Sequence, residues 1–180
     1  MLSERSVDSW KTPFKKGLRK MKPKVIEKES FRVAGYQFEA NLQEIMGSDL
    51  VSRTVARLGE EADLFQNKLG NHLYLVQVYP MKEAFDAAKD PFTTMVGYEV
   101  TGEEAPDGAI LHTVEKNTYV AYTHKGPESD LPHSYDYLYG TWLRENGYMS
   151  LGYDFELWDE RYKPEERDNE IDLFIAVRKL

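Results

Sequence analysis

The 180-residue chain has room for one domain or two small fused halves, and its 41% hydrophobic content suffices for a sizeable core. It has no cysteine, which excludes thiol catalysis, disulfides and thiolate metal sites. The net charge of −8 is uneven: residues 1–24 hold eight Lys or Arg against two Asp or Glu, and the rest hold 15 against 29, so nucleic acid is a poor partner for the acidic body.

The chain begins with a basic arm, residues 1–23, whose apolar positions have helix-like spacing interrupted by Pro13, Gly17 and Pro23. Such an arm could lie on a membrane surface or on nucleic acid, or it could pack loosely on its own domain or a neighbour. It is too short for a helix-turn-helix module. The sequence has no apolar run long enough to span a membrane and no secretory signal, so we expect a cytoplasmic protein.

The first half after the arm reads as strand, helix, strand, strand. Its expected elements are a β-rich stretch over 24–40, a helix over 48–65 and strands over 72–79 and 93–100. Ser48 is the expected helix cap, and the predicted apolar face of the helix consists of Val51, Val55, Leu58, Ala62 and Phe65. An acidic, turn-rich joint follows at 101–108.

The same order then recurs. We expect a strand region over 110–124 with a hairpin about Lys116-Asn117, a helix over 129–146 and strands over 154–162 and 170–177. The helix carries Leu131, Tyr135, Leu138 and Trp142 on one face and ends at Gly147. The last strand is predicted to bury Ile171, Leu173, Ile175 and Val177 on one face.

Two such halves, about 24–101 and 109–180, predict an α+β fold with mostly antiparallel sheet and two main helices flanking a central cleft. Pseudo-symmetric strand–helix–strand–strand modules would meet at an approximate two-fold axis. A groove at that axis, lined from both halves, is the expected ligand site.

The four histidines, His72, His112, His124 and His133, do not have metal-ligand spacing, and no nucleophile elbow, phosphate loop or dinucleotide motif occurs. We therefore predict no metal and no cofactor. His124, which precedes Gly126-Pro127, is expected to be a hydrogen-bonded structural imidazole.

Glu156 stands out in "DFELWDERY", residues 154–162. Period-two alternation places Phe155 and Leu157 on one face, and Glu156 and Trp158 on the other. The carboxylate could be an ordinary solvated one. If its face instead lines the groove, burial among aromatic rings would raise its pKa. Ionised, it would then pair with an organic cation stacked on the rings; protonated, it could act as a general acid.

The motifs "NTYVAYTHKGP" (117–127), "GTWLRENGY" (140–148), "FELWDERY" (155–162) and "EIDLFIAV" (170–177) resemble the GyrI-like effector-binding domain of AraC- and MerR-type bacterial regulators. "FRVAGYQFE" and "DPFTTMVGYEV" agree more loosely, and the resemblance covers residues 24–180. It implies a central aromatic cleft with a glutamate, which would be Glu156. The position two residues later is often Tyr in the family and is Trp158 here, so ring stacking survives but a phenolic hydroxyl is lost.

The resemblance implies further site residues. The helix Trp of the family matches Trp142, and Tyr36 and Tyr98 are chosen because each follows a glycine on a strand expected to border the groove. The missing DNA-binding domain indicates a stand-alone member without direct DNA binding. We expect a binder of aromatic or cationic amphiphiles, of the multidrug type.

Two alternatives remain open: a hydrolase that opens cyclopropane rings of DNA-alkylating natural products, with Glu156 catalytic, and a gyrase-modulating interaction protein. A regulator or gyrase partner, the natural ligand and the oligomeric state are not fixed by the sequence.

Overall fold

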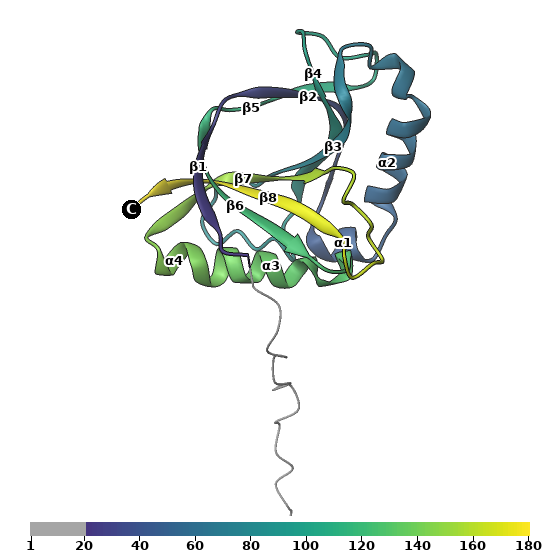
Figure 1. Ribbon diagram of the computed structural model, residues 1–180. Coiled ribbons are helices and arrows are strands. Elements are labelled where there is room, and N and C mark those ends of the chain that lie inside the picture. The colour runs from purple at the N-terminus through teal and green to yellow at the C-terminus, as the bar shows by residue number, and fades with distance from the viewer. Residues whose placement is uncertain (1–20) are drawn as a thin grey trace, which may run out of the picture.

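The computed structural model describes residues 21–180, so the predicted basic arm lies almost wholly outside the described residues. A strongly curled sheet forms the centre, with α2 on one flank and the helix containing α3 and α4 along another (Figure 1). In the described chain no helix combines the length and apolarity that a membrane crossing requires.

The strands follow the predicted order with shifted ends. They are β1 (Lys24–Lys28), β2 (Phe31–Ala40), β3 (Lys68–Val78), β4 (Phe92–Val100), β5 (Ile110–Val114), β6 (Asn117–Lys125), β7 (Tyr148–Trp158) and β8 (Glu170–Lys179). They form one antiparallel sheet in the order β1-β6-β8-β7-β3-β4-β2-β5. The mostly antiparallel α+β architecture is therefore confirmed.

The helical segments are α1 (Leu42–Met46), α2 (Leu50–Glu60), η1 (Ala62–Leu64), η2 (Glu128–Asp130), α3 (Leu131–Tyr137), η3 (Leu138–Trp142) and α4 (Leu143–Glu145). The short α1, which the sequence reading missed, begins with a capping box between Asn41 and Glu44. The predicted first helix begins after Asp49 rather than at Ser48. Its apolar face packs as expected, with Leu58 and Phe65 buried in the core.

The strand order confirms the expected pseudo-symmetry. Read from the middle of the sheet, β7, β8 and β6 on one side mirror β3, β4 and β2 on the other. Helix α2 packs over β2 and β4 in one half, and the α3 helix occupies the corresponding place in the other. The central pair, β3 and β7, thus lies at the seam between the halves, and β7 carries Glu156.

The predicted hairpin at Lys116-Asn117 is wrong. β5 and β6 do not pair with each other; β5 pairs with β2, and β6 pairs with β1. The pairings Lys28↔Asn117 and Phe31↔Val114 belong to one antiparallel register, so the two pairings form one continuous, bent ribbon. Because β1 leads into β2 and β5 leads into β6, this ribbon joins the two ends of the sheet. The sheet therefore curls round on itself and gives the ring seen in Figure 1.

Two glycines allow this curvature. Gly35 on β2 pairs directly with Gly97 on β4, so the loosely similar "VAGYQFE" and "MVGYEVT" motifs lie side by side. A Cβ atom at Gly35 would lie 2.0 Å from the carbonyl oxygen of Val96, and one at Gly97 would lie 2.4 Å from that of Ala34. Only glycine fits where the two backbones approach this closely.

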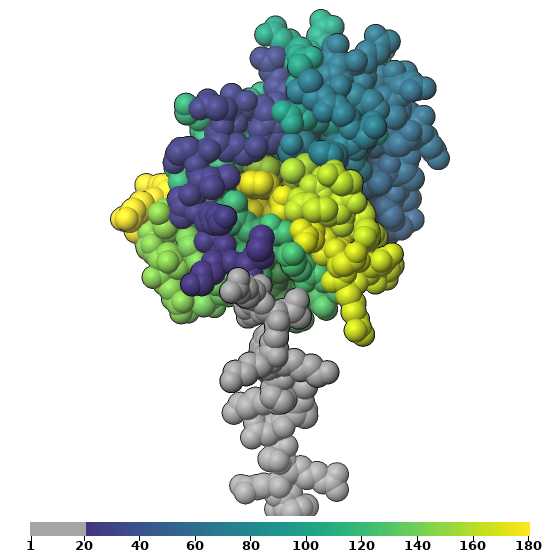
Figure 2. Space-filling view, in the orientation of Figure 1, coloured from purple at the N-terminus to yellow at the C-terminus, as the bar shows by residue number. Residues whose placement is uncertain are grey.

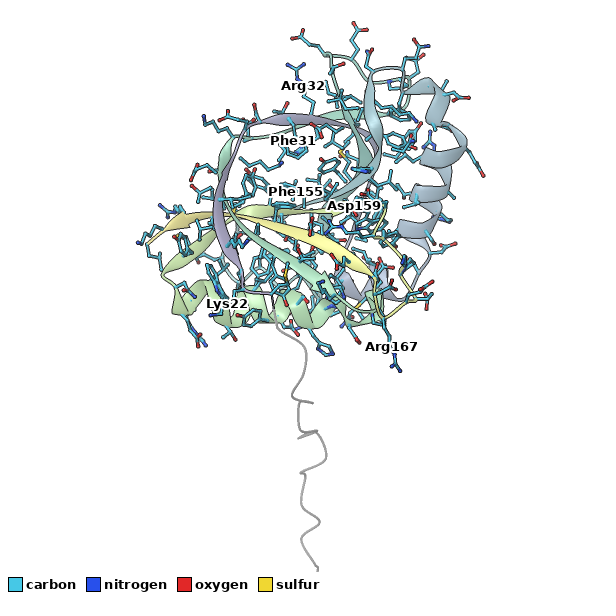
Figure 3. All side chains as sticks on the ribbon, viewed as in Figure 1. Lys22, Phe31, Arg32, Phe155, Asp159 and Arg167 are labelled. Atoms are coloured by element: carbon cyan, nitrogen blue, oxygen red, sulfur yellow. The ribbon has the colours of Figure 1, made fainter. Side chains whose placement is uncertain are left out.

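The two faces of the sheet bury two separate cores. The outer face packs against the helices and includes the predicted Ile171, Leu173, Ile175 and Val177, all at most 1% exposed. The inner face is filled by aromatic and aliphatic side chains, and Figure 3 shows Phe31 and Phe155 inside the curl. Their ring centroids lie 5.4 Å apart, edge to face.

Residues 159–169, which join β7 to β8, are fixed by a charge cluster. The guanidinium of Arg161 forms ion pairs with Asp159 at 2.6 Å, Glu170 at 3.0 Å and Asp172 at 2.6 Å. In the space-filling view this yellow-green segment lies on the surface between β1 and α2 (Figure 2). It places Tyr162 over Trp158, so the segment covers one end of the seam.

Candidate functional site

Every second residue at the end of β7 lies on the outer face of the sheet, toward the α3 helix. These residues are Asp154, Glu156 and Trp158. Phe155 and Leu157 point into the curl, which confirms the predicted alternation. Across the seam, Glu156 pairs with Leu75 of β3, and on its other side with Leu173 of β8. The carboxylate therefore stands among apolar neighbours, and it is only 3% exposed.

Two neutral donors hold the Glu156 carboxylate. The Tyr135 hydroxyl from α3 donates to Oε1 at 2.7 Å, and the Trp158 indole N–H donates to Oε2 at 2.7 Å. Trp158 lies two residues further along the same strand face, so its N–H reaches back to the carboxylate. The indole thereby supplies the hydrogen bond expected to be lost with the family's tyrosine at this position.

A second buried carboxylate, Asp154, lies two residues before Glu156 and is 0% exposed. Its Oδ2 accepts hydrogen bonds from the hydroxyls of Tyr139, at 2.5 Å, and Tyr79, at 2.9 Å. Its Oδ1 has no hydrogen-bond partner in the described structure. The sequence reading missed Asp154 although the alternation that singled out Glu156 applies to it equally.

The helix over these carboxylates supplies a tyrosine to each. Tyr135 and Tyr139 are four residues apart and therefore share a helix face; their rings stack with centroids 6.3 Å apart and planes 20° apart. The helix passes through one turn of π-helix at Leu138–Trp142 before it ends near Gly147, which has φ +71° as the predicted cap requires. Such π-turns are frequent at functional sites.

Burial raises the pKa of both carboxyl groups to about 7. Desolvation is the largest cause at each group, because a low-dielectric surrounding disfavours the charged form. The hydrogen bonds from the tyrosines and Trp158 act in the opposite direction, and the Asp154 charge further raises the pKa of Glu156. Burial also raises the pKa of the Tyr135 and Tyr139 hydroxyls well above 10, so they remain donors at neutral pH.

Neither carboxylate has a cationic partner within residues 21–180. The ion pairs of this part of the chain involve other acidic groups, and the groups that perturb Asp154 and Glu156 are tyrosines, Trp158 and other carboxyls. Buried carboxylates are ordinarily paired with a charge of opposite sign. The seam therefore contains two buried acids and no countercharge from the described protein.

The structure places the two predicted tryptophans differently. Trp158 contacts Glu156 directly, and its ring stacks on Tyr162 at 4.4 Å with planes 9° apart. Trp142 lies seven residues beyond Tyr135, about 10 Å along the helix, and stacks instead on Tyr148 at 5.9 Å. Trp142 is thus not among the residues that contact the carboxylates.

Tyr36 and Tyr98 share the outer face with Glu156 but lie in the other half. Strand pairing places Tyr36 level with Glu156 across the sheet, three strands away. This corresponds to about 14 Å between the two residues along the sheet. The Arg57 guanidinium lies 3.8 Å from the Tyr36 ring centroid, and the Lys68 ammonium lies 4.8 Å from that of Tyr98. One face of each ring is therefore covered by a cation of the protein itself.

His124 fills the structural role expected of it. It is 3% exposed, with Nδ1 2.8 Å from the Ser134 hydroxyl and Nε2 3.1 Å from the Pro127 carbonyl oxygen. A carbonyl can only accept, so Nε2 carries the proton and the imidazole ties the end of β6 to α3.

Two surface hollows lie away from the carboxylates. A hollow of about 540 Å³ lies where α1 meets α2, between Glu39 and Arg53. A smaller one of about 160 Å³ lies beside β1, β6 and β8. Neither includes Asp154 or Glu156. These acids are only 0% and 3% exposed, and tyrosine hydroxyls contact both, so the seam is closed in this conformation.

Comparisons with known proteins identify relatives in sequence and in fold. Residues 21–178 match the model of the GyrI-like small molecule binding domain. The transcriptional regulator BrlR of Pseudomonas aeruginosa is 26% identical over 163 residues; the match covers 89% of this chain but only 57% of that protein.

Among solved structures, SAV2435 bound to tetraphenylphosphonium superposes with a TM-score of 0.65 at 11% identity, covering 88% of this chain and 94% of that one. The EcmrR C-terminal domain gives 0.64 at 16% identity, with 88% and 98% covered. At these identities the two structures establish a shared fold.

Proposed function

The chain belongs to the GyrI-like small-molecule-binding family, and we propose that it binds an amphipathic, aromatic organic cation at the seam between its halves. Glu156 provides the countercharge, and Trp158 and Tyr135 provide the ring surface. The observation that carries this proposal is a buried carboxylate held by two neutral donors and by no cation from residues 21–180.

The apolar seam excludes water from the Glu156 carboxylate. A carboxylate taken out of water is stabilised strongly only by a charge that is itself desolvated. An organic cation with large rings loses little hydration on entering, and the faces of Trp158 and Tyr135 attract its charge. The indole and phenol donors orient the carboxylate meanwhile, so the site is preorganised on the strand side. SAV2435, with the same fold and bound tetraphenylphosphonium, supports a cation of this type as the first probe.

The test is a calorimetric titration of tetraphenylphosphonium at pH 8 into the wild type and Glu156→Gln. Loss of the countercharge should weaken binding about tenfold or more, which is about 1.4 kcal/mol or more. Glu60→Gln, on the exposed face of α2, removes the same charge from the surface and should bind like the wild type. Equal affinity of wild type and Glu156→Gln would remove Glu156 from the role.

A hydrolase is the second candidate, favoured by one observation: both carboxyl groups have a pKa of about 7, the range suited to general acid–base catalysis at neutral pH. Glu156 would accept a proton from water as the water oxygen bonds to one ring carbon. The other carbon of the broken C–C bond would take the electron pair and then a proton from Glu156, so water is added across that bond. Mass spectrometry of a cyclopropane-bearing alkylator incubated with the protein should show the hydrated product. Turnover no faster than that of Glu156→Gln would count against catalysis.

A further inference from the structure

We infer that the seam accepts organic dications, with Asp154 as a second countercharge beside Glu156. This inference rests on the proposed function, which requires only Glu156, and adds to it the class of ligand that the site prefers. The two acids are alternate residues of one strand face, so they are about 6.6 Å apart along β7. Both are buried, at 0% and 3% exposure.

Two tyrosines on the α3 helix have nearly the same spacing as the two acids on β7. Tyr135 and Tyr139 are separated by four residues, about 6 Å along a helix, and each donates its hydroxyl to one of the two acids. The site thus consists of two hydroxyl donors on the helix facing two carboxylate acceptors on the strand, and the spacing within each pair is nearly equal. A ligand with two positive groups at this separation would place one charge beside each carboxylate.

The second observation is the unpartnered oxygen of Asp154. Oδ1 is fully buried and accepts no hydrogen bond from the described chain, while both tyrosine hydroxyls converge on Oδ2. A buried acceptor without a donor is costly, and protonation does not remove the problem, because the new O–H would need an acceptor. A positive charge from a ligand beside Oδ1 offsets this cost by electrostatic attraction, without displacing Trp158 from Glu156.

The surroundings define the spacer between the two charges. The stacked pairs Tyr135–Tyr139 and Trp158–Tyr162 border the acids with flat surfaces, and Leu75, Leu173 and Ile175 lie beside them on the neighbouring strands. A flat aromatic rod therefore fits better than a flexible, hydrated chain. The 4,4′-bipyridinium unit has its nitrogens about 7 Å apart, close to the spacing of alternate residues on a strand.

The experiment compares two ligands of nearly identical shape. N,N′-dimethyl-4,4′-bipyridinium carries two charges, and N-methyl-4-phenylpyridinium carries one. Calorimetric titration at pH 8, above the pKa of about 7 of each acid, should show the dication binding the wild type about tenfold more tightly or better. This comparison needs no variant, so it does not depend on how a substitution affects folding.

Asp154→Asn then locates the second charge. It keeps an oxygen acceptor for the tyrosines and should weaken only the dication, which removes the preference, while Glu60→Gln retains it. Thermal unfolding verifies that each variant is folded. Equal affinity of the two ligands for the wild type, or a preference that survives Asp154→Asn, would overturn the inference.

The outcomes separate this inference from the proposed function. If tetraphenylphosphonium binds through Glu156 but the dication shows no advantage, only the role of Asp154 fails. If no cation binds the wild type, the proposed function fails and the dication inference fails with it.

Discussion

Burial determines the chemistry of Asp154 and Glu156 more than residue type does. The chain holds 31 acidic residues, and most of the ion-paired ones lie at the surface, where the pKa values of Asp86, Asp90 and Asp168 are lowered by lysines or backbone N–H groups. The two seam acids behave oppositely because desolvation outweighs their hydrogen bonds. The same side chain is thus a solubilising group in one place and a candidate ligand contact in another.

The raised pKa values predict a pH-dependent stability. The folded protein keeps protons on Asp154 and Glu156 up to about pH 7, whereas the unfolded chain loses them near pH 4. The folded state therefore binds more protons between these values, and the free energy of unfolding falls as pH rises from 5 to 8. Each shift corresponds to a loss on the order of 3 kcal/mol.

Asp154→Asn removes one of these titrations, so its stability should fall by about 3 kcal/mol less than that of the wild type over the same range. Guanidinium unfolding at pH 5, 6, 7 and 8 measures the difference. Groups that do not interact with Asp154 cancel, and the loss of the Asp154 charge lowers the pKa of Glu156, which acts in the same direction. Parallel pH profiles for the two proteins would show that Asp154 does not titrate in this window.

Sequence reasoning found one residue of this pair. The flanking aromatics and the family motif single out Glu156, whereas Asp154, at the start of the same predicted strand, is not singled out by either. The sequence also does not indicate which side chains contact the two acids. Tyr135 was predicted only as part of an apolar helix face, and Tyr79 lies just past the end of β3.

At the scale of elements, periodicity located the helices and strands but not how they pair. The region 110–124 was read as a hairpin because Lys116-Asn117 suits a turn, yet the chain there bends and continues as a strand in one register with β1 and β2. Pairing is a non-local property that the turn residues did not specify. The π-turn at Leu138–Trp142 was likewise invisible, because its apolar spacing fits an ordinary helix.

The glycine contact between β2 and β4 gives a prediction for strand packing. Gly35→Ala would place a Cβ atom 2.0 Å from the Val96 carbonyl oxygen, so the two strands must separate. We expect a loss of at least about 3 kcal/mol in the free energy of unfolding, measured by urea denaturation.

Gly59→Ala provides the matched control, because no atom lies within 4 Å of a Cβ placed there on the exposed face of α2. It should raise stability by about 0.5–1 kcal/mol through helix propensity. A Gly35→Ala variant as stable as the wild type would show that the sheet can relax without the close contact.

For the molecule as a whole, element order was sufficient to predict the fold class. Two strand–helix–strand–strand halves predict a mostly antiparallel sheet with two flanking helices, because each amphipathic helix must cover one half of the sheet. A ligand site at their junction stays a prediction. The curl of the sheet and its inner aromatic core were not foreseen, since they depend on the Gly35–Gly97 contact and on the bent ribbon.

The bent ribbon also bears on how the protein behaves in crowded solution. The two end strands of the sheet order, β1 and β5, are paired on one side only and are each five residues long. β1 has the sequence KVIEK, with charges at both ends, and β5 has the sequence ILHTV. Edge strands this short offer little template for a second chain to add a strand, so the fold limits fibrillar self-association at these two margins.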